Sequence, residues 1–180
     1  MNEGPLIVKP ALSATGVGLE VLDSKENVTA YSKRFSDLLK LENYIVQPLI
    51  ESIKTEGEWS LIFIAGAYSH SIHKAPKKGD VMVHAERGGS LNFKQAPLDL
   101  VEEASKAIPS ILKAFESQSN KANYVPLYLR CDFIKDSTQD KYLLSECEGV
   151  EPELFFRAKP SSEETFVEAL ENYFSGSIFE

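Results

Sequence analysis

Residues 127–148, with the sequence LYLRCDFIKDSTQDKYLLSECE, contain the pattern that decides the fold of this chain. Two runs rich in apolar residues, residues 127–135 and 141–148, flank the polar segment DSTQD at residues 136–140. Two strand-like runs joined by a short polar segment are typical of a β-hairpin. We therefore predict that the two runs are neighbouring antiparallel strands.

The charged residues of this hairpin alternate along both runs. Arg130 and Asp132 are two positions apart, as are Glu146 and Glu148, so each pair shares one face of its strand. If the charged faces of the two strands coincide, pairing of the runs brings one guanidinium and three carboxylates into one patch. Carboxylates this close repel one another unless a cation joins them, and oxygen ligands without histidine or cysteine suit Mg²⁺. The alternative is a solvated sheet face with a simple ion pair between Arg130 and Glu146.

The two cysteines of the chain lie between these charged residues. Because Cys131 and Cys147 alternate with the charged side chains, we expect them on the opposite strand face, buried as small hydrophobic residues. So few cysteines are typical of a reducing compartment and argue against a disulfide scaffold.

The rest of the sequence alternates between strand-like and helix-like segments. A second hairpin is predicted from residues 58–64 and 68–74, which are joined by residues 65–67. Further strands are predicted at residues 5–9, 19–22 and 44–50, and helices at residues 27–40, 98–115 and 163–174. This order predicts an α+β fold with a small N-terminal lobe, residues 1–55, and a larger body of antiparallel sheet and helices, residues 56–180, that carries the metal site.

The composition is that of a globular protein, since 43% of the 180 residues are apolar and 26% are charged. A formal charge of -8 argues against non-specific binding to nucleic acid, which requires a basic surface. No apolar run approaches the ~20 residues of a membrane span, and the first residues lack the pattern of a secretory signal. We therefore expect a cytoplasmic protein without a membrane partner.

Two shorter features suggest a nucleotide ligand. Lys9 ends a strand-like run and precedes a loop of small residues with Ser13 and Gly16, where backbone N–H groups could approach phosphate oxygens. Gln47 and Pro48 end another apolar run, as in a hinge whose backbone pairs with an adenine edge. Each feature has a simpler alternative, namely an ordinary β-turn for the loop and an edge strand ended by proline for the hinge.

Taken in order, these segments resemble the ATP-grasp superfamily, and most of all its glutathione-synthetase-like and ribosomal-modification-like carboxylate–amine ligases. The resemblance runs from about residue 6 to residue 157. It rests on Val8-Lys9-Pro10, Ser13-Ala14-Thr15-Gly16, Tyr44-Ile45-Val46-Gln47-Pro48, Gly57-Glu58-Trp59-Ser60, Tyr68-Ser69-His70, Lys74-Ala75-Pro76, Gly79-Asp80, Gly88-Gly89, Leu129-Arg130-Cys131-Asp132 and Ser145-Glu146-Cys147-Glu148. It implies an ATP-grasp fold in which both lobes contribute to an ATP site.

The resemblance also implies roles for residues of the first half of the chain. Lys9, with the loop of Ser13 and Gly16, resembles the part that binds the phosphates of ATP. Gln47 resembles the adenine-binding linker between the lobes, and Glu58 resembles the acidic residue near the ribose.

In the hairpin, Asp132, Glu146 and Glu148 resemble the ligands of one or two Mg²⁺ ions, although many family members have asparagine in place of Glu148. Arg130 resembles the catalytic arginine that stabilises charge on the transferred phosphate and on an acyl phosphate. These roles favour the Mg²⁺ hypothesis over the solvated face.

The activity that the resemblance implies is an ATP-dependent carboxylate–amine ligase. ATP phosphorylates a small carboxylate substrate to an acyl phosphate, an amine attacks it, and ADP and phosphate leave. Family members have a further N-terminal domain and an earlier lysine that this sequence does not match, so we expect a truncated domain, a piece of a longer polypeptide, or an inactive ATP-grasp-derived interaction module. We also expect the incomplete N-terminal lobe to form a homo-oligomer through an open sheet edge near residues 5–9.

Overall fold

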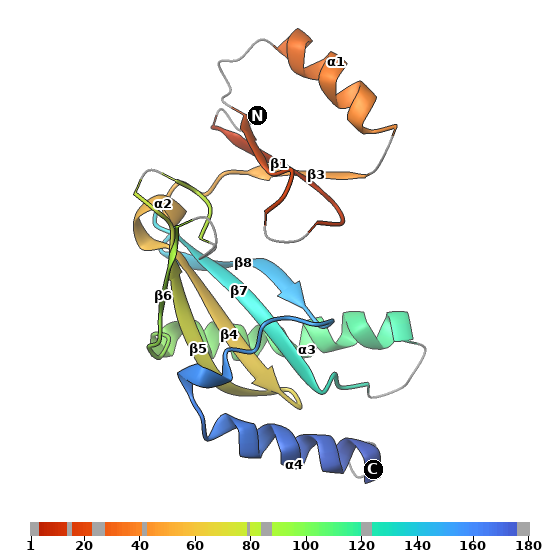
Figure 1. The fold of residues 1–180 in the computed structure, drawn as a ribbon, viewed down its shortest axis with the longest axis vertical. Coiled ribbons are helices and arrows are strands. Elements are labelled where there is room, and N and C mark those ends of the chain that lie inside the picture. The colour runs from red at the N-terminus through yellow and green to blue at the C-terminus, as the bar shows by residue number, and fades with distance from the viewer. Residues whose placement is uncertain are drawn as a thin grey trace. The chain divides into compact units, whose positions relative to one another are not determined.

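The computed structural model of the chain describes residues 4–13, 16–22, 28–40, 43–78, 80–83, 88–119 and 124–175. Internal contacts divide the chain into two compact units, Met1–Glu51 and Ser52–Glu180. Each unit contains its own antiparallel sheet (Figure 1).

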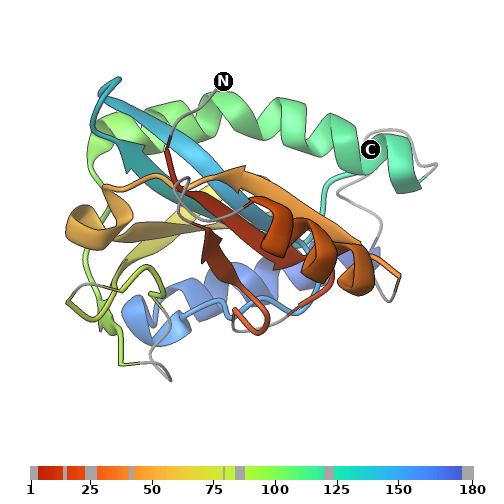
Figure 2. The same cartoon turned by 90° about the horizontal axis from the view of Figure 1, so that it is seen from above.

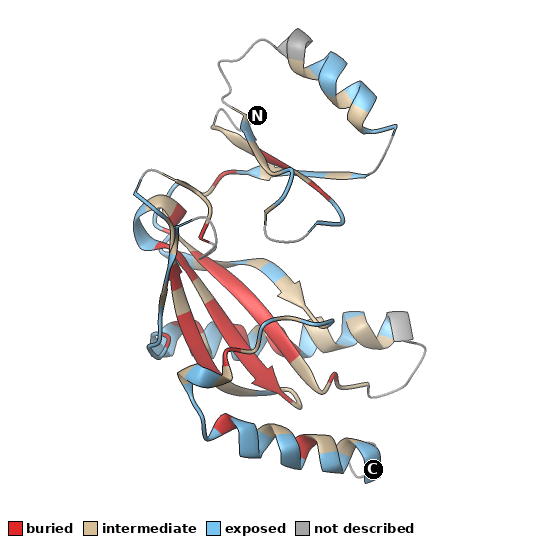
Figure 3. Ribbon diagram, viewed as in Figure 1, coloured by how far each residue is buried: buried red, intermediate tan, exposed pale blue. Residues whose placement is uncertain are grey.

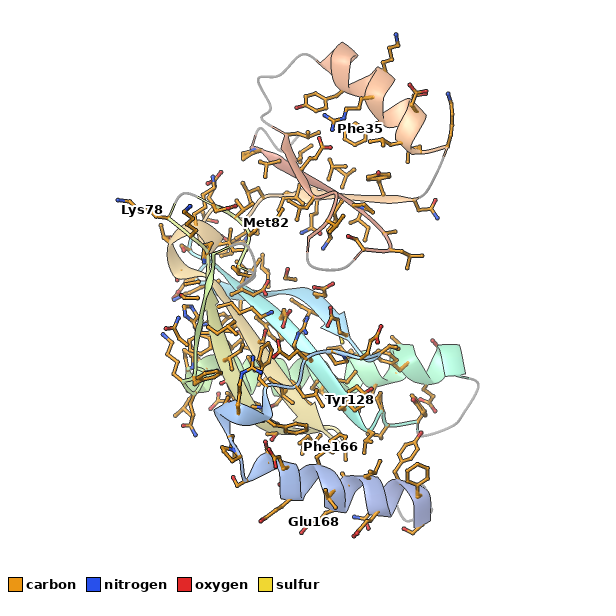
Figure 4. All side chains as sticks on the ribbon, viewed as in Figure 1. Phe35, Lys78, Met82, Tyr128, Phe166 and Glu168 are labelled. Carbon is orange, nitrogen blue, oxygen red and sulfur yellow. The ribbon has the colours of Figure 1, made fainter. Side chains whose placement is uncertain are left out.

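The first unit consists of a small sheet and helix α1. Its elements are β1 (Leu6–Pro10), β2 (Glu20–Leu22), α1 (Val28–Leu38) and β3 (Tyr44–Pro48), and the strands are ordered β2-β1-β3. The helix contacts the sheet through Phe35, whose ring lies edge-on to that of Tyr44 with 6.2 Å between the centroids (Figure 4). One face of the small sheet is therefore turned toward α1.

Strand β1 is the central strand of this small sheet. Leu6, Ile7 and Val8 pair with β2 on one side, and all of Leu6–Pro10 pairs with β3 on the other. The expectation of an open edge near residues 5–9 is therefore wrong for residues 6–8, because neighbouring strands lie on both sides of them and already occupy their hydrogen-bonding groups. Self-association through β1 would first require β2 or β3 to leave.

The second unit is built around a sheet with the strand order β6-β5-β4-β7-β8. Its elements are α2 (Ile53–Glu56), β4 (Glu58–Ile64), β5 (Ala67–Ala75), β6 (Ser90–Asn92), α3 (Leu98–Ser119), β7 (Tyr128–Asp136), β8 (Lys141–Glu148), the 3₁₀-helix η2 (Phe156–Ala158) and α4 (Ser162–Ser175). The two predicted hairpins, β4–β5 and β7–β8, are both present. The elements β6, α2 and η2 were not predicted from the sequence, because three or four residues are too few to show a strand or helix periodicity of apolar residues. Within the described ranges, no helix has both the length and the apolar character that crossing a membrane requires.

Helix α3 covers one face of this sheet, and that face is apolar (Figure 2). Leu61 and Phe63 of β4 are buried there against Leu100 of α3. Burial is concentrated along the central strands β4, β5 and β7 (Figure 3). The prediction that the two cysteines face the core is confirmed, since Cys131 is fully buried in this cluster and Cys147 packs against it.

The other face is covered at one end by α4 and by the segment that leads into it. Tyr128 of β7 and Phe166 of α4 lie with their ring centroids 6.2 Å apart (Figure 4). The buried residues of this second apolar cluster are Ile62, Ile64, Ile72, Phe155 and Ala169. Toward the start of β4 the same sheet face changes from apolar to charged, and this charged end contains the candidate site.

Candidate functional site

The charged end of the sheet face gathers side chains from four strands. These side chains lie side by side because β4 pairs with β5 and with β7, and β7 pairs with β8. Residues at alternate positions of a strand share a face of the sheet. This set, which we call the charged face, consists of Glu58 and Ser60 of β4, Lys74 of β5, Arg130 and Asp132 of β7, and Glu146 and Glu148 of β8. The four charged residues of the β7–β8 hairpin do lie on one face, because Arg130 pairs with Glu148 and Asp132 pairs with Glu146.

Asp132 is the centre of the charged face and is only 1% exposed. Its carboxylate accepts a hydrogen bond from the Ser60 hydroxyl at 2.6 Å, from the Lys74 ammonium at 3.0 Å and from the Arg130 guanidinium at 3.0 Å. Burial by itself would raise the pKa of the Asp132 carboxyl, but Lys74 and Arg130 hold that pKa below its ordinary value. Asp132 is therefore a buried, ionised group whose charge is compensated by two cations.

Lys74 is a site residue for which no role was predicted from the sequence. Its side chain is 7% exposed, and its Nζ lies 3.1 Å from Glu58 and 3.0 Å from Asp132. Burial would lower the pKa of Lys74, but the two carboxylates outweigh burial and raise it, so the ammonium stays charged. The sequence pattern does not identify this role, because a register shift between Ile62 and Phe63 in the β4–β5 hairpin decides that Lys74 lies directly opposite Glu58.

Glu58 is buried, and Lys74 is its hydrogen-bonded cation. Burial, and then the negative charge of Asp132, raise the pKa of Glu58 from 4.5 to about 7, although Lys74 partly opposes the shift. The proton of this carboxyl therefore exchanges near neutral pH. The charged face can change its net charge at Glu58 while Asp132 stays ionised.

This raised pKa predicts a specific pH dependence of stability. Between pH 4.5 and about 7 the unfolded chain ionises Glu58 while the folded protein keeps it protonated, so the free energy of unfolding falls as the pH rises through this window. The full shift corresponds to about 3 kcal/mol. Relative to the wild type, Glu58→Gln should therefore gain stability steadily across this window, as measured by urea unfolding at several pH values.

The control for this measurement is Glu168→Gln, because Glu168 is exposed on α4. This variant makes the same carboxyl-to-amide change away from the charged face and shows what that change does by itself. A stability difference for Glu58→Gln that does not depend on pH would show that Glu58 titrates at its ordinary pKa in the folded protein.

Arg130 joins Asp132 to Glu148. Its Nη2 lies 2.6 Å from a carboxylate oxygen of Glu148, which is the residue opposite Arg130 in the β7–β8 ladder. The ion pair therefore differs from the Arg130–Glu146 pair of the solvated-face alternative. Burial would lower the pKa of Arg130, and the neighbouring carboxylates raise it. Burial also raises the pKa of Glu148, whereas Glu146 on the same strand face is exposed to solvent.

Two protein cations, Lys74 and Arg130, lie at the centre of the charged face. Among the residues that the structure describes, no group of three histidine, cysteine, aspartate or glutamate side chains converges on a point suited to a metal ion. Asp132, Glu146 and Glu148 share a face, but Asp132 is held by Lys74 and Arg130. The donors themselves are hard carboxylate oxygens, which is the chemistry that Mg²⁺ prefers.

The first unit contains the other residues that are predicted from the sequence to contact a nucleotide. In the register of β1 and β3, Ile7 pairs with Gln47 and Lys9 pairs with Ile45, so Lys9 and Gln47 share one face of the small sheet. The Ser13 hydroxyl donates to the carbonyl oxygen of Val17 at 2.6 Å, and Gly16 has a φ of 68°, so these residues form a local turn. Residues 14 and 15 of the predicted loop lie outside the described residues.

Comparison with solved structures identifies the fold. The structure of D-cycloserine synthetase DcsG is similar with a TM-score of 0.74 and 24% identity, over 94% of this chain and 55% of that protein. D-alanine–D-alanine ligase from Bacillus anthracis complexed with ATP is similar with a TM-score of 0.58 and 16% identity, over 93% of this chain and 50% of that protein. Another structure of the Bacillus anthracis ligase gives a TM-score of 0.59 and 18% identity, over 93% of this chain and 52% of that one.

These neighbours are ATP-grasp ligases, and the present chain spans about half the length of each. No protein-family model matches the sequence, and a search of curated proteins finds no significant relative. The protein therefore has the α+β ATP-grasp fold that the order of short motifs predicted, and the likeness identifies the fold alone.

Proposed function

We propose that this chain binds ATP together with Mg²⁺ and contributes the ATP-binding part of a carboxylate–amine ligase. The observation that carries the proposal is the charged face, on which Lys74 and Arg130 are buried around Asp132. Lysine and arginine are rarely buried unless their charge has a partner, and a phosphate chain is an anion that two such cations can bind. A solved structure of the same fold, the Bacillus anthracis ligase, is a complex with ATP.

Lys74 and Arg130 are the proposed phosphate contacts of the second unit. Each already donates to a carboxylate at 3.0 Å, and a phosphate oxygen can replace that acceptor with a charge-assisted hydrogen bond. Glu58 is the partner that releases Lys74 most easily, because a pKa of about 7 lets Glu58 become neutral near neutral pH. We therefore expect Lys74 to exchange Glu58 for a phosphate oxygen.

Asp132, Glu146 and Glu148 are the proposed Mg²⁺ ligands. Their carboxylate oxygens fit the ion by chemistry, but Asp132 becomes available only when Lys74 and Arg130 turn to another anion. The phosphates of ATP are that anion in our proposal, so the ion and the nucleotide bind together. When bound, Mg²⁺ neutralises phosphate charge and polarises the transferred phosphoryl group.

The first unit carries proposed nucleotide contacts of its own. Lys9 supplies a further cation for phosphate, the loop of Ser13 and Gly16 supplies backbone N–H groups, and Gln47 contacts the adenine. Support for this assignment comes from the β1–β3 register, which puts Lys9 and Gln47 on the same sheet face.

The proposed reaction is an acyl transfer in two steps. A carboxylate oxygen of a small acid forms a bond to the γ-phosphorus of ATP while the bond to the bridging oxygen breaks, which gives an acyl phosphate and ADP. An amine then bonds to the acyl carbon and loses a proton, and phosphate leaves. Arg130 stabilises the negative charge that develops on the transferred group in both steps.

Titration calorimetry with ATP tests the proposal. The wild type should bind ATP more tightly with Mg²⁺ than with EDTA, and Glu146→Gln should reduce this Mg²⁺-dependent gain in affinity by about tenfold or more. Since Glu146 is exposed, its substitution should change the free energy of unfolding by no more than about 0.5 kcal/mol. The change in binding can then be assigned to a lost ligand and not to a damaged fold.

The matched control is again Glu168→Gln, which makes the same chemical change at an exposed position of α4 and should bind like the wild type. If folded wild-type protein gives neither heat nor a thermal shift with ATP and Mg²⁺, the nucleotide proposal is refuted and a binding module of another kind is favoured. An unchanged Mg²⁺ dependence in Glu146→Gln would remove Glu146 from the ligand set.

A further inference from the structure

The two cysteines face each other behind the charged face. Cys131 of β7 and Cys147 of β8 are register partners, and their Sγ atoms lie 3.6 Å apart. Both thiols are free and belong to the apolar side of the sheet that α3 covers. The nucleotide proposal uses neither of them.

The geometry of a register pair suits a disulfide. Directly opposed residues in an antiparallel ladder have Cα atoms about 4.5–5.5 Å apart, and disulfides form between Cα atoms about 4.4–6.8 Å apart. The sulfur atoms need to approach from 3.6 Å to a bond of about 2.05 Å, which side-chain rotation can accomplish without moving a strand. We propose that Cys131 and Cys147 form a thiol-modification site at which a reversible disulfide links β7 to β8, an inference that goes beyond the proposed function and does not depend on it.

A low-molecular-weight disulfide such as oxidised glutathione is the oxidant in this proposal. Cys147 is half-buried whereas Cys131 is fully buried, so the sulfur of Cys147 attacks first. It loses its proton and bonds to one sulfur of the reagent, while the other sulfur leaves and takes up a proton to become a thiol. The sulfur of Cys131 then attacks Cys147, loses its proton and displaces the second reagent thiol. Two cysteines are oxidised, and one reagent disulfide is reduced to two thiols.

The disulfide would hold an edge strand in place. Among the described strands, β8 lies at the edge of the sheet and pairs with β7. The cysteines lie between the register pairs Arg130–Glu148 and Asp132–Glu146, so the cross-link fixes the strand positions from which Glu146 and Glu148 extend. Oxidation should therefore slow the opening of β8.

To test this proposal, the folded full chain is equilibrated in glutathione buffers in which the fraction of oxidised glutathione increases stepwise. Free thiols should fall from two to none per chain, the mass should decrease by two hydrogen atoms, and dithiothreitol should reverse both changes. The melting temperature of the oxidised protein should rise by about 5 °C, because a cross-link restricts the unfolded chain. Amide hydrogen exchange should slow in peptides from residues 141–148 and stay unchanged in α1.

Two serine variants distinguish the pair from independent thiols. Cys131→Ser should stop at a stable glutathione adduct on Cys147, because the second attacking sulfur is absent, while Cys147→Ser should stay unmodified in the folded protein. The proposal is overturned if the folded wild type keeps both thiols in fully oxidised buffer, if it accumulates the single adduct, or if it forms disulfides only between chains.

Discussion

Asp132→Asn should lower the free energy of unfolding by about 3–5 kcal/mol, the cost of removing one partner from a buried ion pair. The variant keeps the shape of the side chain and its hydrogen bond from Ser60, but it leaves the buried cations Lys74 and Arg130 without the carboxylate that both contact. Lys74 keeps Glu58 as a partner and Arg130 keeps Glu148, but neither carboxylate replaces the charge of Asp132 that both cations share. Urea unfolding at neutral pH measures the loss.

Glu146→Gln is the matched control, since it removes a carboxylate from the same face and its position is exposed. Similar unfolding midpoints for the two variants would show that the ion-pair network around Asp132 contributes little. The double variant Lys74→Met, Asp132→Asn should lose less stability than the sum of its single changes, because the second substitution removes a charge that the first leaves unpaired. Strict additivity would contradict the coupling of these two side chains.

Gly57→Ala should destabilise the second unit by about 3 kcal/mol or more, through backbone strain and steric overlap. Gly57 links α2 to β4 with φ 72° and ψ -156°, a conformation that is essentially restricted to glycine. A Cβ atom at this position would overlap the carbonyl oxygen of Lys74, the register partner of Glu58. The substitution therefore pushes β4 away from β5 where the charged face begins.

Gly4→Ala is the control for this prediction, because among the described residues, apart from its chain neighbours, none comes within 4 Å of the position that a Cβ atom would occupy at Gly4. Its melting temperature should match that of the wild type, whereas Gly57→Ala should melt earlier and should bind ATP more weakly if the nucleotide proposal holds. A wild-type melting temperature for Gly57→Ala would mean that the backbone at Gly57 can relax without disturbing the pairing of Glu58 with Lys74.

The β7–β8 hairpin was predictable because its information is local. Alternation along residues 127–135 and 141–148 divides the side chains of each strand between two faces, and the polar segment between the runs predicts an antiparallel pair. The fold class follows from the same kind of local pattern, supported by the order of the motifs. Which faces coincide is decided by a register shift between Asp132 and Phe133, which pairs Asp132 with Glu146 and Cys131 with Cys147. Without this shift, the register at the turn would pair Asp132 with Ser145 and place Glu146 and Glu148 on the opposite face.

Other features of the site depend on the pairing of strands that are distant in the sequence, as for β4 and β7, or on a register shift within a hairpin, as for β4 and β5. The pairing of β4 with β7 places Ser60 beside Asp132, and the pairing of β4 with β5 brings in Lys74. The position of β1 between β2 and β3 is also a property of the assembled sheet, and the expectation of an open edge failed for that reason. Short elements such as α2 and β6 are stabilised by neighbours and have no pattern of their own.

By itself, the sequence determined that the two hairpins form, that Arg130 and Asp132 share a face of one strand as Glu146 and Glu148 do of the next, and that the fold is α+β. The register shifts that bring these faces together belong to the assembled sheet. Only the tertiary structure decided how these charges are satisfied: Asp132 is shared by Lys74 and Arg130, and Glu58 has a pKa of about 7. The physical reason is that alternation depends on the covalent chain, whereas burial and charge compensation depend on which strands meet. A carboxylate next to two buried cations cannot be recognised until β5 and β7 are placed on either side of β4.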